Sequence, residues 1–120
     1  MTDKTPEFIR ALSAAVNEFA EARDWEPFHS PKNLSMALMV EAAELVEHFQ
    51  WLSEQQSFDL PPQKRQAVSA ELADVLIYLV RLASRLAIDL EQAAWEKLEI
   101  NKQKYPVEKS RGIAKKYTEL

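Results

Sequence analysis

The chain has 120 residues, no cysteine and a formal charge of −4. This length suits one domain, and a hydrophobic content of 47% allows a packed core. The lack of cysteine excludes disulfides and thiolate zinc sites, and the acidic balance disfavours a nucleic-acid polymer as partner. No apolar run approaches the ~20 residues that cross a bilayer, and residues 1–5 lead into charged residues. We therefore expect one cytoplasmic domain over residues 1–120 that binds no membrane.

Glycine is nearly absent, and proline divides the chain. The one glycine is Gly112, which disfavours phosphate-cradling loops, dinucleotide-binding folds and tight hairpins, because all three need glycine. Proline is tolerated in the first turn of a helix but not in its interior. The six prolines fall between apolar-periodic segments, at Pro6, Pro27, Pro31, Pro61, Pro62 and Pro106. The sequence therefore predicts an all-α fold with four helices.

The first two predicted helices carry apolar residues at spacings of three and four. The first is predicted over about residues 5–23, with Thr5 as N-cap. The second is predicted over about residues 31–51, with Ser30 as N-cap.

The third predicted helix follows Pro61 and Pro62 and is the central element. Its apolar surface is wide enough for a helix that is buried on more than one side, and is formed by Val68, Leu72, Val75, Leu76, Leu79, Leu82 and Leu86. One copy of the chain can hardly cover this surface. We therefore expect a homo-oligomer that associates through its helices.

The fourth predicted helix begins after Asp89. Asp89 and Gln92 resemble a capping box, and the helix should reach Tyr105, just before Pro106. The remaining residues, 106–120, are predicted to form a basic tail. The helical core should accordingly span about residues 5–105.

Two pairs of acidic residues stand at helical spacing on the second and third predicted helices. Glu41 and Glu44 are three residues apart, as are Glu71 and Asp74, so each pair points from one helix face. If the helices pack antiparallel, the four carboxylates converge, and they repel one another unless a cation neutralises them. Mg²⁺ prefers octahedral oxygen ligands and commonly takes carboxylates together with water and substrate phosphates. The pattern therefore favours a magnesium site.

Two other interpretations of the acids compete with this one. A single acid pair at this spacing is more often a solvated face, as it would be in a noncatalytic helical adaptor. A di-iron four-helix bundle needs two Glu-x-x-His motifs. The chain offers only Glu26 and His29, in a predicted loop, because Leu45 stands three residues before His48. The di-iron interpretation therefore fails.

The acid pairs resemble the signature of the MazG-like all-α nucleoside triphosphate pyrophosphohydrolases, a Glu-rich helix followed by Glu-x-x-Asp on the next helix. Val40 stands where the broader family commonly has a second glutamate, which leaves the number of metal ions open. The resemblance covers about residues 8–120. Other stretches resemble the dCTP pyrophosphatase branch of the family: residues 23–29, 31–34, 49–51 and 74–78, Lys97 with Asn101, and residues 104–106 and 116–120.

This resemblance implies a four-helix MazG-like bundle, a dimer or a tetramer, that hydrolyses dCTP or a modified dCTP to the nucleoside monophosphate and pyrophosphate in nucleotide pool sanitation. It implies that Glu41, Glu44, Glu71 and Asp74 are both the magnesium ligands and the catalytic residues. Among them we assign Glu44 to orient or deprotonate the attacking water. Phosphoryl transfer depends mainly on positioning and charge neutralisation, so a sparse site suffices. A broad-specificity house-cleaning pyrophosphatase is the alternative.

Aromatic side chains are the candidates for reading the base. Trp25, Phe28, His29 and Trp51 offer flat faces and a hydrogen-bond donor. The resemblance places the loop that carries the first three over the base. It also implies that Tyr78 packs against the deoxyribose.

Other candidate substrate contacts are basic or amide side chains. Lys97 and Asn101 stand four residues apart on the fourth predicted helix and suit a phosphate tail, and the resemblance gives the same assignment. Asn33 either contacts the nucleotide or caps its helix. Arg81, seven residues after Asp74, either joins the phosphate contacts or forms a surface salt bridge.

Overall fold

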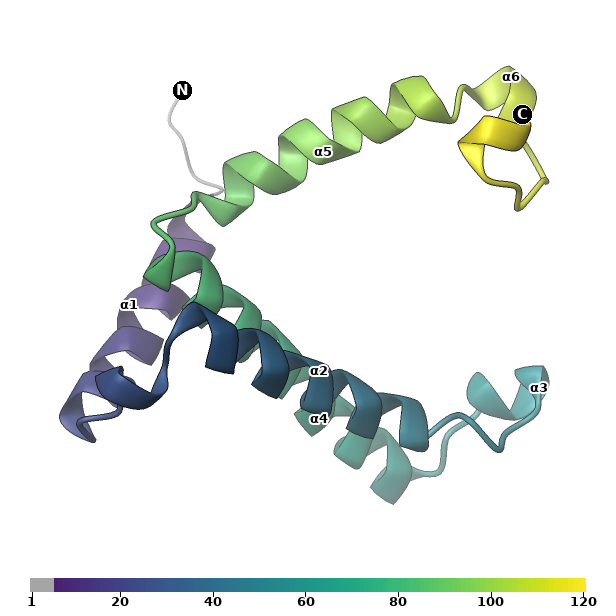
Figure 1. The fold of residues 1–120 in the computed structure, drawn as a ribbon. Helices are drawn as coiled ribbons and strands as arrows, with labels where there is room; N and C mark the ends of the chain where they lie inside the picture. Colours follow the sequence, from purple (N-terminus) through teal and green to yellow (C-terminus); the bar gives the residue numbers. More distant parts are fainter. Residues whose placement is uncertain (1–5) are drawn as a thin grey trace. The chain divides into compact units, whose positions relative to one another are not determined.

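The computed structural model describes residues 6–120, among which the regular structure is entirely helical. The predicted N-cap Thr5 lies outside the described residues. The all-α class is confirmed, and the four predicted helices correspond to α1, α2, α4 and α5. In chain order the elements are α1 (Pro6–Ala22), η1 (Glu26–Phe28), α2 (Pro31–Glu47), α3 (Glu54–Ser57), α4 (Pro62–Arg85), α5 (Leu90–Lys104), α6 (Val107–Ser110) and η2 (Tyr117–Glu119) (Figure 1).

The chain divides into two compact units, with the division between Ile88 and Asp89. In the first unit α2 and α4 pack against each other and run antiparallel, and α1 packs on α4 as well (Figure 1). The buried apolar core consists of Ala20, Leu34, Val68, Val80 and Ala83. None of the helices among the described residues combines the length and hydrophobicity that crossing a bilayer requires.

The helix α2 begins as predicted and ends earlier than predicted. The Ser30 hydroxyl accepts a hydrogen bond from the backbone N–H of Asn33 at 3.1 Å, which is the expected N-cap. The helix ends at Glu47 and not near Trp51. The chain leaves the helix there because the N–H groups of His48 and Phe49 bond to carbonyls three residues back, which tightens the last turn.

A short helix that the sequence analysis did not predict follows α2. Ser53 and Gln56 form a complete capping box at the start of α3: the Gln56 N–H donates to the Ser53 hydroxyl at 3.1 Å, and the Ser53 N–H donates to the Gln56 side chain at 2.9 Å. The apolar periodicity that predicted the longer helices cannot detect a helix of four residues.

Within one chain the apolar surface of α4 is only partly covered, as the sequence analysis expected. Val68, Val80 and Ala83 are buried, but Leu72, Leu79 and Leu86 keep 53%, 37% and 49% of their surface exposed. A helix packed against α1 and α2 leaves part of so wide an apolar face uncovered. Within one chain, therefore, only part of the apolar surface of α4 is buried.

The second unit contains α5, α6 and η2. The Asp89 carboxylate accepts a hydrogen bond from the Gln92 N–H at 3.0 Å, so the predicted cap is present. The Gln92 side chain, however, donates to Glu96 at 3.0 Å rather than completing a capping box. Residues 106–120 contain α6 and η2, and Tyr117 packs edge-on against Tyr105 with 6.0 Å between ring centroids.

Candidate functional site

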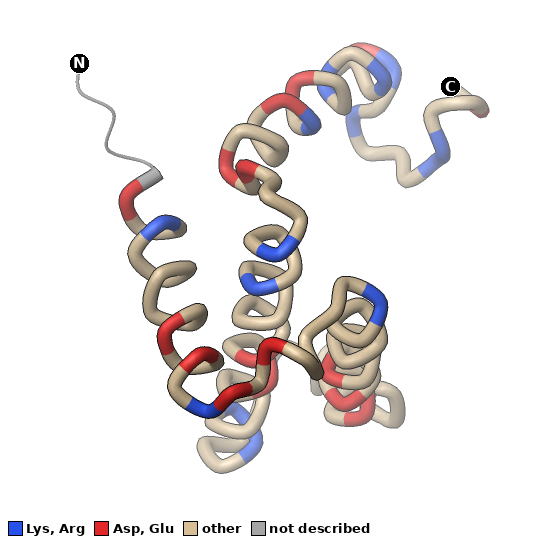
Figure 2. The backbone as a smooth tube through the Cα atoms, turned by 60° about the vertical axis from the view of Figure 1, so that its left-hand side comes forward, with Lys and Arg blue, Asp and Glu red and all other residues tan. Residues whose placement is uncertain are grey.

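Three of the four predicted acidic residues meet between α2 and α4. Both helices carry acidic positions (Figure 2). Glu41 and Glu44 lie one turn apart on α2, and Glu71 approaches them from α4. Carboxylate oxygens of the three residues lie within 4.8 Å of one another. Antiparallel packing thus brings together carboxylates that are about thirty residues apart in the sequence.

The environment of this cluster disfavours negative charge. Burial, hydrogen bonding with Glu71 and repulsion from Glu44 and Glu71 together raise the pKa of Glu41 from 4.5 to about 7, and burial is the largest of these causes. One oxygen of Glu71, Oε2, is buried and has no hydrogen-bond partner among the described residues. Buried polar atoms are normally paired, and an unpaired one is costly.

A divalent cation fits this donor set. Three carboxylates supply hard oxygen ligands of the kind that Mg²⁺ prefers. A cation would give the unpaired Glu71 oxygen a partner and would offset the repulsion that raises the pKa of Glu41. The described residues therefore contain a candidate metal centre at Glu41, Glu44 and Glu71.

Asp74, the fourth predicted ligand, is not part of the close cluster. Its side chain is exposed, and the group of mutually close ligand atoms comprises only the three glutamates. Asp74 instead lines a neighbouring cavity together with Tyr78, which follows it by one turn of α4. The sequence predicted that four carboxylates converge on one site, whereas the structure has three clustered acids and a fourth at the edge of a cavity.

This cavity has a volume of about 250 Å³ and is lined by residues of α1, α4 and the connection between α1 and α2. Trp25, His29 and Tyr78, which the sequence analysis named as contacts for base and sugar, are among its walls. The walls that the sequence analysis did not name are Val16, Phe19, Ala20, Ile77 and Arg81. Aromatic faces beside a carboxylate suit a flat, partly polar ligand.

The segment that carries Trp25 and His29 has a defined conformation. Asp24 adopts a left-handed backbone (φ 55°) after α1, where the Trp25 N–H bonds to the Ala20 carbonyl at 3.0 Å. The Trp25 ring packs edge-on against Phe19 and His29, with centroid distances of 5.6 and 5.8 Å. This turn directs the aromatic pair to one wall of the cavity.

Three other predicted substrate contacts lie outside the cavity walls. Phe28 and Trp51 are 66% and 87% exposed. The Asn33 side-chain amide donates to the Phe28 carbonyl at 3.1 Å, so it ties the start of α2 to the preceding turn. Of the two roles left open for Asn33, a local structural one is present in this structure.

Lys97 and Asn101 both lie on α5, in the second unit. Lys97 is exposed and Asn101 is partly buried. Their spacing of four residues places them on one face of the helix, as predicted.

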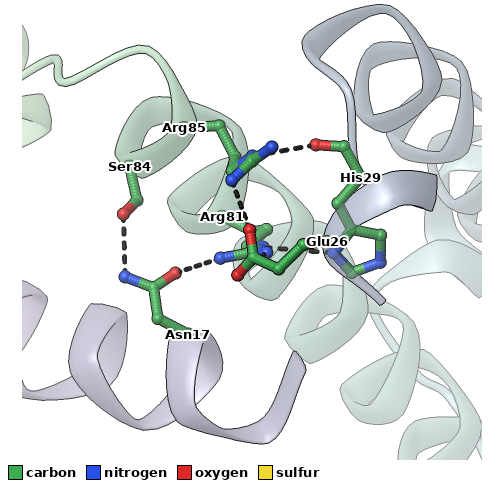
Figure 3. Close-up of polar contacts among 6 residues, drawn as sticks. All are labelled: Asn17, Glu26, His29, Arg81, Ser84 and Arg85. Carbon is green, nitrogen blue, oxygen red and sulfur yellow. Dashed lines mark hydrogen bonds and ion pairs between the residues drawn. The ribbon is translucent and has the colours of Figure 1, made fainter. Parts of the chain in front are cut away.

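Arg81 is neither a surface residue nor a free cation. It is only 2% exposed, and its guanidinium donates to Nδ1 of His29 at 3.1 Å, to the Asn17 side-chain oxygen at 2.6 Å and to Glu26 at 3.2 Å. Figure 3 shows how this network continues: Arg85 contacts Glu26 and the His29 carbonyl, and Asn17 donates to Ser84. The network joins α1, η1 and α4.

Sequence reasoning missed this network for a physical reason. Its bonds join residues that are more than fifty positions apart, and helical spacing reveals only neighbours three or four positions apart. One signal was available. Arg81 stands between Val80 and Leu82 in the most apolar stretch of α4, and a charge in such a position is rarely buried unless it is paired.

Comparisons with known proteins agree with this fold. The model of the MazG-like family matches residues 36–120. The chain is 52% identical to dCTP pyrophosphatase 1 of Mus musculus and 47% identical to dCTP pyrophosphatase 1 of Homo sapiens; each alignment covers 98% of this chain and 69% of the relative. The crystal structure of a pyrophosphatase from Archaeoglobus fulgidus DSM 4304 matches with a TM-score of 0.77 and 38% identity, over 82% of this chain and 93% of the other.

The chain belongs to the MazG-like family. The resemblance drawn from the acid pairs is thereby confirmed, and the curated relatives carry the name of the branch that the shorter stretches indicated. The matched region contains α2 from Met36 onward and the whole of α4. It therefore includes all three clustered glutamates.

Proposed function

We propose that this protein hydrolyses dCTP, or a modified dCTP, between its α and β phosphates, to the nucleoside monophosphate and pyrophosphate. The convergence of Glu41, Glu44 and Glu71 on one point is the observation that carries this proposal. The names of the relatives, dCTP pyrophosphatase 1 and a pyrophosphatase, support the reaction and the substrate. We place the activity in the cytoplasm, in sanitation of the nucleotide pool.

The proposed cofactor is Mg²⁺, held by the three glutamates, with Asp74 as a further ligand from the edge of the cavity. When bound, it supplies neutralisation of charge on the phosphate oxygens. Glu44 is proposed to orient the attacking water or accept its proton. The pKa of Glu41, raised to about 7, suits this residue to exchange a proton as the site is occupied and vacated.

The base and sugar are proposed to occupy the cavity beside the metal centre. Trp25 and His29 would contact the base and Tyr78 the deoxyribose, since all three line that cavity. Aromatic stacking on a base contributes about 1–3 kcal/mol in nucleic-acid binders. The remaining predicted substrate contacts stay proposals: Phe28, Asn33 and Trp51 around the base, and Lys97 and Asn101 at the phosphates.

We also propose a homo-oligomer, a dimer or a tetramer. Apolar side chains on α2 and α4 are more than half exposed in the single chain, at Met36, Met39, Val40, Val46 and Leu72. Exposed apolar side chains that gather on two neighbouring helices are typical of a protein contact. We do not propose a nucleic-acid polymer as a partner of this protein.

The reaction is tested by incubating the protein with a panel of nucleoside triphosphates, including methylated and oxidised ones, with Mg²⁺. Orthophosphate is measured with and without added inorganic pyrophosphatase. We expect orthophosphate only after that enzyme is added, with dCTP or a modified dCTP giving the highest kcat/KM. Direct release of orthophosphate, or no metal-dependent product from any triphosphate, would contradict the proposal. Equal rates across bases would favour the broad-specificity alternative.

The non-enzymatic alternative, a helical adaptor with solvated acids, predicts a different response to metal. An adaptor should show no rise in Tm on addition of Mg²⁺, because a ligand stabilises a fold only if it binds the folded state. The raised pKa of Glu41 and the buried oxygen of Glu71 favour the enzyme, since solvated acids show neither.

A further inference from the structure

The contact between Arg81 and His29 defines where the imidazole carries its proton. The Arg81 Nε–H donates to Nδ1 of His29 at 3.1 Å. A guanidinium has only donors and stays protonated in proteins, so the ring nitrogen that faces it must be an unprotonated acceptor. A neutral imidazole has one protonated nitrogen, and here that nitrogen is Nε2.

The surroundings also keep the ring neutral. Burial lowers the pKa of His29 below 6.5, and the positive charges of Arg81 and Arg85 lower it as well, while Glu26 acts in the opposite direction. Each of these charges is held in place. Glu26 is paired with both arginines, and Arg81 is fixed by a further bond to Asn17. The proton on Nε2 is therefore the only exchangeable hydrogen-bond donor that the ring can offer.

The imidazole lies in the wall of the cavity, with Trp25 edge-on beside it and Tyr78 in the same wall. Nδ1 is occupied by Arg81, and none of the described residues forms a hydrogen bond with Nε2. We infer that Arg81 is a positioning residue for substrate recognition: it locks His29 as a neutral donor at Nε2 that binds an acceptor atom, a carbonyl oxygen or ring nitrogen, of the nucleobase. This inference rests on the proposed function for the identity of the ligand.

A purely structural Arg81 would only hold α1, η1 and α4 together. The two roles differ in their effect on the ring. Loss of a structural contact lowers stability without changing the proton on a folded histidine, whereas loss of a positioning contact frees Nδ1 to become protonated. The tautomer of His29 is therefore the decisive measurement.

The first experiment records the ¹⁵N shifts of the histidine ring nitrogens in the full chain, with the His29→Gln variant to assign the signals. In the unaltered protein we expect Nε2 protonated and Nδ1 unprotonated. In Arg81→Met we expect a mixture of the two tautomers. Arg85→Met is the matched control, because Arg85 contacts the His29 carbonyl and not its ring. A protonated Nδ1 in the unaltered protein, or an unchanged tautomer in folded Arg81→Met, would overturn the inference.

The second experiment stands even if Arg81→Met does not fold. Glutamine places an amide donor near the position of Nε2, whereas asparagine places its amide near Nδ1. His29→Gln should therefore keep KM for the preferred triphosphate within about 3-fold, and His29→Asn should raise KM about 3- to 10-fold with a smaller change in kcat, as expected for one lost neutral hydrogen bond. Equal KM values for the two variants would contradict the role of Nε2.

Failure of the inference and failure of the proposed function can be told apart. The tautomer is read without substrate, so it tests the Arg81–His29 contact whatever the enzyme does. Absence of pyrophosphate release from the unaltered protein would remove the proposed function, and with it the nucleobase as ligand. Pyrophosphate release together with a protonated Nδ1 would keep the function and reject the role of Arg81.

Discussion

At the scale of single residues, the chemistry rests on like charges that the fold forces together. Glu41, Glu44 and Glu71 have their ligand oxygens within 4.8 Å of one another, and Glu71 contributes a buried oxygen without a partner. In the absence of a cation this arrangement destabilises the fold, because three negative charges in a partly dehydrated site repel one another. The cluster is therefore expected to respond to metal and to protons, and each response can be measured.

Replacing Glu71 with glutamine should separate metal binding from folding. Glu71→Gln removes one ligand charge and one source of repulsion, so Tm without metal should stay equal or rise. A cation at 100 times its Kd stabilises the fold by about 2.7 kcal/mol, and a 100-fold loss of affinity at the same concentration leaves about 0.4 kcal/mol. Pyrophosphate release should fall at least about 100-fold. Thermal melts with and without Mg²⁺, and the coupled assay, measure both effects.

The matched control for this change is Glu47→Gln. Glu47 lies on α2 one turn after Glu44, is exposed and is not part of the cluster. It should keep the full Mg²⁺-linked rise in Tm and the full activity. Equal losses in the two variants would show that net charge, and not the cluster, determines the response to metal.

The raised pKa of Glu41 gives the metal-free protein a definite pH dependence. The folded state binds the proton with a pKa of about 7 and the unfolded state with 4.5, so between these values the folded state holds more protons. This contribution to the free energy of unfolding is therefore greatest at low pH and falls as pH rises from about 5 to about 7. Thermal melts in EDTA across this range should show the fall, and Glu41→Gln should remove it.

His29 also makes the free energy of unfolding depend on pH, with the opposite sign to Glu41. The comparison with Glu41→Gln is therefore essential. His29 has a lowered pKa, and its share of the stability increases as pH rises toward 6.5. The difference between the unaltered protein and Glu41→Gln cancels this share. Saturating Mg²⁺ should also abolish the fall, because ligand carboxylates must be deprotonated to bind metal. A difference that does not change with pH would contradict the raised pKa.

At the scale of elements, the sequence predicted helices where a local signal exists. Ser30 before Pro31 and Asp89 before Leu90 were recognised as caps, and both side chains accept the expected hydrogen bonds. The end of α2 was placed too late, because the apolar residues Phe49 and Trp51 continue the periodicity into a turn. Periodicity reports which residues are apolar and not where the backbone leaves the helix.

The candidate site was likewise predictable only where its residues have a local signal in the sequence. Spacing on one helix gave Glu41 with Glu44, and a short connection gave their approach to Glu71. The position of Asp74 beside the cavity and the contacts of Arg81 depend on how three separate elements pack. The apolar neighbours of Arg81 indicate that a buried charge there needs partners, but the local sequence does not say which residues these are, so the contacts themselves emerge only with the structure.

The N-cap of α2 should be measurable as an effect on stability. Ser30→Ala removes the acceptor for the Asn33 N–H and should lower the free energy of unfolding by about 1 kcal/mol. Ser35→Ala is the control, since the exposed Ser35 hydroxyl donates only to a carbonyl of its own helix and should change stability by no more than about 0.5 kcal/mol. Urea unfolding measures both. Equal effects of the two changes would argue against the cap.

At the scale of the whole molecule, the exposed apolar surface raises the question of what covers it. The core of the first unit has five buried apolar residues, while side chains such as Met39, Val46 and Leu72 remain more than half exposed. Exposed apolar surface on this scale is unusual for a monomer. Association of several copies through α2 and α4 would convert this surface into a core.

We therefore expect sedimentation velocity to give a dimer or a tetramer. Met39 and Val46 lie two turns apart on the same face of α2, and both are exposed. The double change Met39→Lys and Val46→Lys should yield monomers, because lysine charges opposed across a symmetric contact repel and lose hydration. Glu47→Lys, on the same helix but outside the apolar residues, should leave the oligomer intact. Circular dichroism should show unchanged helix content in both variants. A monomeric unaltered protein at micromolar concentration would contradict the proposed oligomer, and the apolar face would then need another partner.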